Sequence, residues 1–199
     1  MSKLVALTEL YEILNLVFLS GRLEGDRPLS ALLIAPVEAG KTSLLSSFSV
    51  NNGILWATDL SPWGIMQHYG KKLAAGELQH IVIPDLLVPL SHGWEQRGAF
   101  IAFMNGLLEE GVGKIITFMF HLKITTPFGC GLVTCIPPKI LNDHRRRWTD
   151  VGFLSRLMPI SWQYSPETIQ GVGEYLQALR HHRPYKTTLA PRERSTISL

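Results

Sequence analysis

Short apolar runs alternate with helical stretches along most of the chain. Five runs have the length of buried strands, and they cover residues 30–35, 54–58, 80–87, 131–135 and 159–164. Between and after these runs, helical patterns cover residues 41–48, 62–75, 94–110, 138–148, 152–157 and 166–179. Residues 114–128 are rich in β-forming residues and predict a hairpin. The alternation predicts an α/β fold in which a mainly parallel sheet is covered by helices on both faces.

The first 20 residues are rich in Leu and Val, but their pattern is amphipathic. Glu9 and Glu12 interrupt the segment, and no run of about 20 apolar residues follows, so the pattern predicts neither a membrane span nor a signal peptide. Apolar positions recur at helical spacing at Leu7, Leu10, Leu14, Val17 and Phe18. We therefore expect an amphipathic helix packed on the core of a cytoplasmic protein.

The composition is that of one folded domain. Of the 199 residues, 46% are hydrophobic and 18% are charged, and no linker divides the chain, so we expect one domain over residues 1–180. Cys130 and Cys135 are too few for a disulfide framework and lack the further ligands of a zinc site. We expect both cysteines to be reduced core residues.

Positive charge is concentrated near the C-terminus. Residues 1–179 hold 14 Lys and Arg against 15 Asp and Glu, whereas residues 180–199 hold five against one. We expect residues 181–199 to form a flexible basic tail, which either solubilises the protein or contacts nucleic-acid phosphates. A second basic cluster, Arg145, Arg146 and Arg147 before Trp148, has three interpretations: a grip on nucleic acid, a subunit interface, or a solvated helical face.

The segment APVEAGKT, residues 35–42, follows the first apolar run and precedes a helix. Phosphoryl oxygens need converging backbone N–H groups and a cation that reaches the terminal phosphates. Gly40 lets the backbone approach, Lys41 supplies the cation, and Thr42 supplies the hydroxyl that coordinates magnesium in the pattern G-x4-GK-[ST], although Ala35 replaces the first glycine. We expect ATP to be bound by Ala35, Pro36, Val37, Glu38, Ala39, Gly40, Lys41, Thr42 and Ser43.

Asp85 ends the third apolar run, HIVIPDLL, and follows Lys41 by 44 residues. An acid at the tip of a buried strand is typical of a Walker B aspartate, which orients magnesium. We expect Thr42 and Asp85 to hold a magnesium ion. The alternative is an ordinary loop aspartate after a strand.

With these motifs, the layout over about residues 5 to 180 resembles the AAA+ ATPase family, as a compact member with a reduced lid. The parts that carry the resemblance are APVEAGKT, IVIPD, LVTC and GFLSRLMPI. It implies a three-layer P-loop NTPase with a mainly parallel sheet in the order 5-1-4-3-2. It also implies that Thr134 is the sensor that contacts the γ-phosphate or the attacking water, between Lys41 and Asp85. Arg156 would be the arginine finger inserted into a neighbouring subunit. The alternative for Thr134 is an ordinary threonine at the end of a strand, and the alternative for Arg156 is an arginine that caps a short helix.

One departure from the family concerns the hydrolytic base. Leu86 stands where the family carries the glutamate that polarises water. Asp59, at the end of the second predicted strand, is the first substitute, although it also fits a helix N-cap. Glu38 and Glu95 are the next candidates.

A second departure is the single C-terminal helix in place of the family's helical lid, where Arg180 and Arg183 alone are placed to imitate the lid arginine.

Three functions remain. The first is an ATPase that uses ATP and Mg²⁺, forms a homo-oligomeric ring or filament, and acts on nucleic acid or a nucleic-acid-bound protein. The second is a nucleotide-gated assembly or adaptor protein with little or no hydrolysis, and the third is a small-molecule phosphotransferase. The compact size implies a partner protein that supplies specificity. The spacing of the seven histidines predicts no metal site besides that of ATP-bound magnesium.

Overall fold

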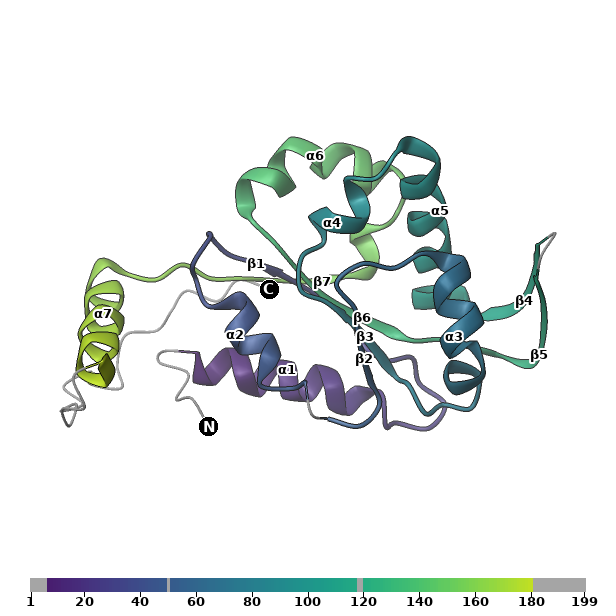
Figure 1. Cartoon of the computed structure of the whole chain (residues 1–199), viewed down its shortest axis with the longest axis horizontal. Helices are drawn as coiled ribbons and strands as arrows, with labels where there is room; N and C mark the ends of the chain where they lie inside the picture. Colours follow the sequence, from purple (N-terminus) through teal and green to yellow (C-terminus); the bar gives the residue numbers. More distant parts are fainter. Residues whose placement is uncertain (1–6, 50, 118–119, 181–199) are drawn as a thin grey trace.

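The computed structural model describes residues 7–49, 51–117 and 120–180, and its core is a five-stranded parallel sheet (Figure 1). The strands of this sheet are β1 (Ala31–Ile34), β2 (Ile54–Trp56), β3 (His80–Ile83), β6 (Gly131–Ile136) and β7 (Met158–Ser161). Their order is β2-β3-β6-β1-β7. Numbered among themselves, these strands have the order 5-1-4-3-2, so the predicted sheet order is confirmed.

Helices cover both faces of the sheet, which gives three layers. One face carries α1 (Thr8–Ser20) and α2 (Lys41–Ser46), and the other carries α3 (Pro62–Ala74), α4 (Leu87–Leu90), α5 (Trp94–Asn105) and α6 (Pro138–Asp150) (Figure 1). The amphipathic N-terminal helix is thus confirmed. The last helix, α7 (Pro166–Arg180), follows β7 and stands beside the layers in Figure 1. The predicted basic tail, residues 181–199 with Arg183, lies outside the described residues.

The central strands are buried on both faces because helices cover both. Successive strand residues alternate between two core clusters: Leu32 and Ile83 belong to the cluster under α3 to α6, whereas Leu33 and Cys135 belong to the cluster under α1 and α2. In the parallel register, Leu32 pairs with Thr134 and Leu33 pairs with Cys135. This alternation decides which side of the sheet each candidate site residue faces.

Strand β3 is shorter than predicted. It ends at Ile83, because Pro84 has no amide hydrogen to continue the ladder. Asp85 Oδ1 then accepts a hydrogen bond from the amide of Leu87 at 3.0 Å, at the start of α4. The prediction of a strand to residue 87 is therefore wrong beyond Ile83, and α4 was not predicted.

The segment between α5 and β6 follows the predicted pattern with local differences. Helix α5 continues as a π-helical turn, η1 (Gly106–Glu110). Together, α5 and η1 occupy the predicted helix of residues 94–110. The hairpin is confirmed, because β4 (Val112–Thr117) and β5 (Phe120–Phe128) pair antiparallel. After α6, the predicted short helix is a single 3₁₀ turn, η2 (Leu154–Arg156).

Two further expectations concern cysteines and membranes. Cys130 and Cys135 are free and buried, as predicted. Within the described ranges, no helix is both long enough and apolar enough to cross a membrane.

His80 begins β3 and lies in the core. It is only 1% exposed, its Nε2 donates to the carbonyl of Leu29 at 3.1 Å, and its ring meets Phe18 edge to face. A Cβ at Gly21 or Gly131 would fall within 3 Å of the imidazole, so both glycines make room for the ring. Burial lowers the pKa of His80 to about 4.

This burial predicts a loss of stability in mild acid. Between pH 6.5 and about pH 4 the unfolded chain binds a proton at His80 that the folded chain does not bind, so the free energy of unfolding rises with pH across this window. At pH 4.5 we expect a loss of about 2–3 kcal/mol relative to pH 7 from this group. Urea unfolding at both pH values measures it: His80→Gln should remove this part, whereas His68→Gln, at an exposed position on α3, should retain it. An equal pH dependence in wild type and His80→Gln contradicts the prediction.

Candidate functional site

The 35–42 loop leaves β1 at the carboxyl edge of the sheet and leads directly into α2. Gly40 adopts the left-handed conformation with φ of 77°, which favours glycine. A Cβ at this position would lie 3.1 Å from Leu7 Cδ1 and 3.3 Å from the Tyr164 hydroxyl oxygen. The backbone conformation therefore favours glycine here, and a side chain would also make tight contacts with Leu7 and Tyr164.

The chain beyond β7 holds this loop from behind. Trp162 is buried, and its Nε1 donates to the carbonyl of Ala39 at 3.2 Å. The Trp162 amide donates to the carbonyl of Ile34 at 3.2 Å, which continues the pairing of β7 with β1. This contact is not predictable from local sequence pattern, since residues 39 and 162 are 123 positions apart.

Lys41 is the cation of the loop. Its Nζ donates to the carbonyl of Ala35 at 2.6 Å and also to the carbonyl of Pro36. Partial burial lowers the pKa of Lys41, while its electrostatic interactions with Cys135 and Asp85 act in the opposite direction. The ammonium group is therefore held by two carbonyls of its own loop.

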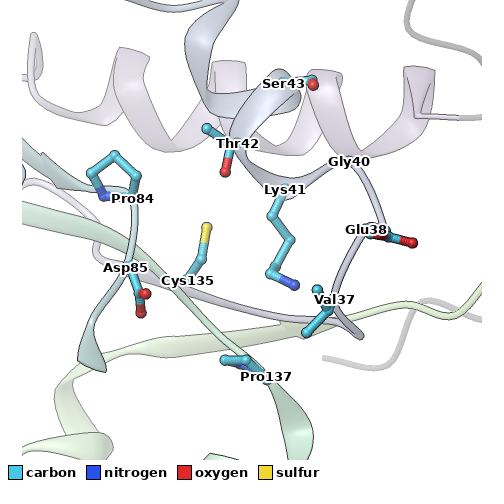
Figure 2. A pocket seen from close by; sticks show the side chains of 10 residues that line it. All are labelled: Val37, Glu38, Gly40, Lys41, Thr42, Ser43, Pro84, Asp85, Cys135 and Pro137. Carbon is cyan, nitrogen blue, oxygen red and sulfur yellow. The ribbon is translucent and has the colours of Figure 1, made fainter. Parts of the chain in front are cut away.

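A pocket of about 390 Å³ lies between the loop and the ends of the central strands (Figure 2). The loop and the start of α2 form one wall. The opposite wall comes from the chain after β3 and from the end of β6. The lining residues are Val37, Glu38, Gly40, Lys41, Thr42, Ser43, Pro84, Asp85, Cys135 and Pro137. The structure thus brings together the two predicted motifs, which are far apart in the sequence.

Asp85 lies exposed on the far wall of this pocket. Its Oδ1 accepts the amide hydrogen of Leu87, and no other hydrogen bond engages the carboxylate within the described residues. Across the pocket, Thr42 is exposed at the start of α2. Both side chains are exposed and line the pocket.

Thr134 does not face this pocket. Its hydroxyl is fully buried and donates to the carbonyl of Ile83 at 2.7 Å. Because side chains alternate along β6, Thr134 shares a face with Leu32 and Ile83, whereas Cys135 faces α2 and lines the pocket. The strand lies between β1 and β3 as expected, but the residue it presents to the pocket is Cys135.

Among the positions considered for the hydrolytic base, residues 86 and 59 lie away from the pocket. Leu86 is fully buried in the core under α3 to α6, and its amide donates to the carbonyl of Cys135 at 3.0 Å. Asp59 binds His92 Nε2 through Oδ2 at 2.9 Å and does not line the pocket. Strand β2 lies three strands from β1, about 14 Å away at the usual strand spacing. Of the acids proposed as substitutes, Glu38 alone lines the pocket, whereas Glu95 is in the first turn of α5.

Two further observations concern Asp59 and Glu38. The N-cap of α3 is Ser61, whose hydroxyl accepts the amide hydrogen of Gly64, so the interpretation of Asp59 as this cap is wrong. Glu38 has a positive φ of 67° although it is not glycine. Its carboxylate points away from Lys41 in Figure 2.

Comparison with known proteins adds no relative. No protein-family model and no curated protein matches the chain.

Arg156 lies at the opposite edge of the sheet from the pocket. It ends η2 just before β7, so it is at the amino end of a strand, whereas the pocket is at the carboxyl ends. Its guanidinium forms an ion pair with Glu109 and donates to the carbonyl of Gly152, and its buried Nε has no hydrogen-bond partner among the described residues. Four residues of β7 span about 13 Å, so Arg156 does not reach the pocket of its own chain.

The basic cluster on α6 is open to solvent. Arg145, Arg146 and Arg147 are all exposed, whereas Trp148 is buried and stacks on His144. Trp148 therefore anchors the helix to the core and is not a surface for stacked bases. Arg180 is the last residue of α7.

Proposed function

We propose that this chain binds Mg-ATP between the 35–42 loop and Asp85, as an AAA+-like P-loop ATPase. The observation that carries the proposal is the shared pocket of Lys41 and Asp85 at the carboxyl ends of the strands (Figure 2). Ligands of open parallel sheets bind at this edge. The sheet order supports the proposal, because it puts β6 between the strand of the loop and the strand of the acid.

The groups in the pocket suit magnesium and a triphosphate. The Thr42 hydroxyl and the Asp85 carboxylate are hard oxygen ligands of the kind that Mg²⁺ prefers when phosphate and water complete its shell. Lys41 supplies positive charge for the terminal phosphates. When bound, magnesium would neutralise phosphate charge, while Thr42 and Asp85 hold it.

We further propose that copies of the chain assemble head to tail. Arg156 is too far from its own pocket, so an arginine finger would act on the pocket of a neighbouring copy, and repetition of this contact forms a ring or a filament. The exposed arginines of α6 fit a nucleic-acid backbone as the substrate of the assembly. A partner protein would then supply specificity.

A second candidate is a nucleotide-gated assembly protein with slow turnover. It is favoured by the absence of an acid at the expected place of the hydrolytic base, among the described residues. Leu86 stands there and is buried in the core, and the substitute Asp59 is bound to His92 outside the pocket. A glutamate in place of Leu86 would be a buried carboxylate and would not reach the pocket. Of the acids considered as substitutes, Glu38 alone lines the pocket, so Glu38 or a group from another copy is the remaining candidate for activating water.

Calorimetric titration of the wild-type protein with Mg-ATP tests the proposal, with turnover and particle mass measured on the same sample with and without DNA. Binding of one nucleotide per chain supports the site. Turnover that rises with assembly supports the ATPase, and nucleotide-dependent assembly without turnover supports the gated protein. Absence of nucleotide binding rejects both.

Glu38 provides a test of the loop itself. A non-glycine residue with positive φ is strained, and a carboxylate beside phosphates repels them. We expect Glu38→Gly to tighten Mg-ATP binding by about fivefold, equivalent to about 1 kcal/mol. The matched variant Glu38→Gln removes the charge but keeps the strained backbone, so calorimetry on both separates the two causes. Weaker binding by both variants contradicts the prediction, and loss of turnover in Glu38→Gln would identify Glu38 as the hydrolytic acid.

A further inference from the structure

The end of β6 presents a thiol to the pocket. Figure 2 shows Cys135 between Lys41 and Asp85, with its sulfur directed toward Thr42. The neighbouring Thr134 is directed to the other face of the sheet, where its hydroxyl binds the Ile83 carbonyl. Cys135 is therefore the side chain of β6 that a ligand between Lys41 and Asp85 would meet.

The position of this thiol is fixed by the sheet. Cys135 pairs with Leu33 of β1 on one side, and its carbonyl accepts the amide hydrogen of Leu86 on the other. The residue is 1% exposed. Within the described part of the chain, Sγ has no hydrogen-bond partner, whereas the sulfur of Cys130 donates to the carbonyl of Gly131. An unpartnered polar group that is almost fully buried and aimed into a pocket is suited to contact a ligand.

We infer that the S–H group of Cys135 contacts the terminal phosphoryl group of the bound nucleotide, so that Cys135 discriminates triphosphate from diphosphate. This inference rests on the proposed function. Lys41 and Asp85, which flank the thiol, are the residues assigned to the terminal phosphates and to magnesium. A thiol is a weak hydrogen-bond donor, and it adds no negative charge beside the phosphate.

Removing the thiol of Cys135 should lower the ratio of ATP affinity to ADP affinity and leave ADP affinity unchanged. Cys135→Ala removes the donor, and we expect about fivefold weaker binding of a non-hydrolysable ATP analogue, in line with one hydrogen bond. Cys135→Ser keeps a donor and should retain at least the wild-type ratio. Thr134→Val and Cys130→Ala alter equally buried positions off the pocket and should leave the ratio unchanged.

A spectroscopic measurement separates contact from structure. In the Cys130→Ala background, one S–H stretching band remains in the infrared spectrum. We expect this band to shift with Mg²⁺ and the ATP analogue, but not with Mg²⁺ and ADP. Equal losses of ATP and ADP affinity in Cys135→Ala, an unshifted band, or a changed ratio in Thr134→Val would each overturn the inference. If wild type binds nucleotide through Lys41 but these results fail, the inference alone is wrong, whereas absence of nucleotide binding in wild type rejects the proposed function as well.

Discussion

Replacing Lys41 with alanine is expected to weaken Mg-ATP binding by at least about 100-fold, which corresponds to about 2.7 kcal/mol. The ammonium group lines the pocket, and on the proposed function it supplies the positive charge that attracts the terminal phosphates. Calorimetric titration with Mg-ATP measures the effect. Lys71→Ala, which removes an exposed lysine of α3, is the matched control and should bind as wild type does.

Two further observations make this experiment decisive. Lys41→Met keeps much of the side-chain volume without the charge, so similar losses in both variants exclude a collapsed loop. Asp85→Asn separates metal from phosphate: nucleotide affinity without Mg²⁺ should be unchanged, whereas the gain in affinity on adding Mg²⁺, and any turnover, should be lost. Wild-type affinity in Lys41→Ala would remove the loop from the site.

The second large effect is expected at Arg156. We expect Arg156→Ala to bind nucleotide normally but to lose turnover, by about 1,000-fold if the arginine acts as a finger in trans. Mixing Arg156→Ala with Lys41→Ala should restore part of the activity, because each variant supplies the half-site that the other lacks. Steady-state turnover and particle mass across a range of protein concentrations provide the measurement.

The ion pair of Arg156 with Glu109 supplies the matched control. A purely structural arginine would hold η1 and η2 together through this pair, so Glu109→Gln would then reproduce the effects of Arg156→Ala. If Arg156 acts as a finger, its contact with the neighbouring copy in the assembly does not need the ion pair with Glu109. Glu109→Gln should therefore retain turnover. Urea unfolding of both variants reports the structural share. A monomeric protein with concentration-independent turnover would reject the AAA+-like assembly and favour a phosphotransferase.

Local pattern was sufficient for the fold class. The five sheet strands and most helices follow from apolar runs and helical spacing, because a parallel sheet buried on both faces requires continuous apolar strands. The pattern failed where one residue outweighed it. Pro84 ends β3 at Ile83 although the predicted strand runs to residue 87, and Ser61 rather than Asp59 caps α3.

The site divides in the same way. The sequence by itself determined the loop with Lys41 and Thr42 and the acid Asp85, because a glycine-bearing loop after a buried strand and an acid after another are local features. Only the tertiary structure decided that Cys135 rather than Thr134 faces the pocket, since neighbouring side chains on a strand face opposite layers. It also decided the pairing of Arg156 with Glu109 and of Asp59 with His92. Such contacts join segments distant in sequence, and their geometry depends on how the helices pack on the sheet.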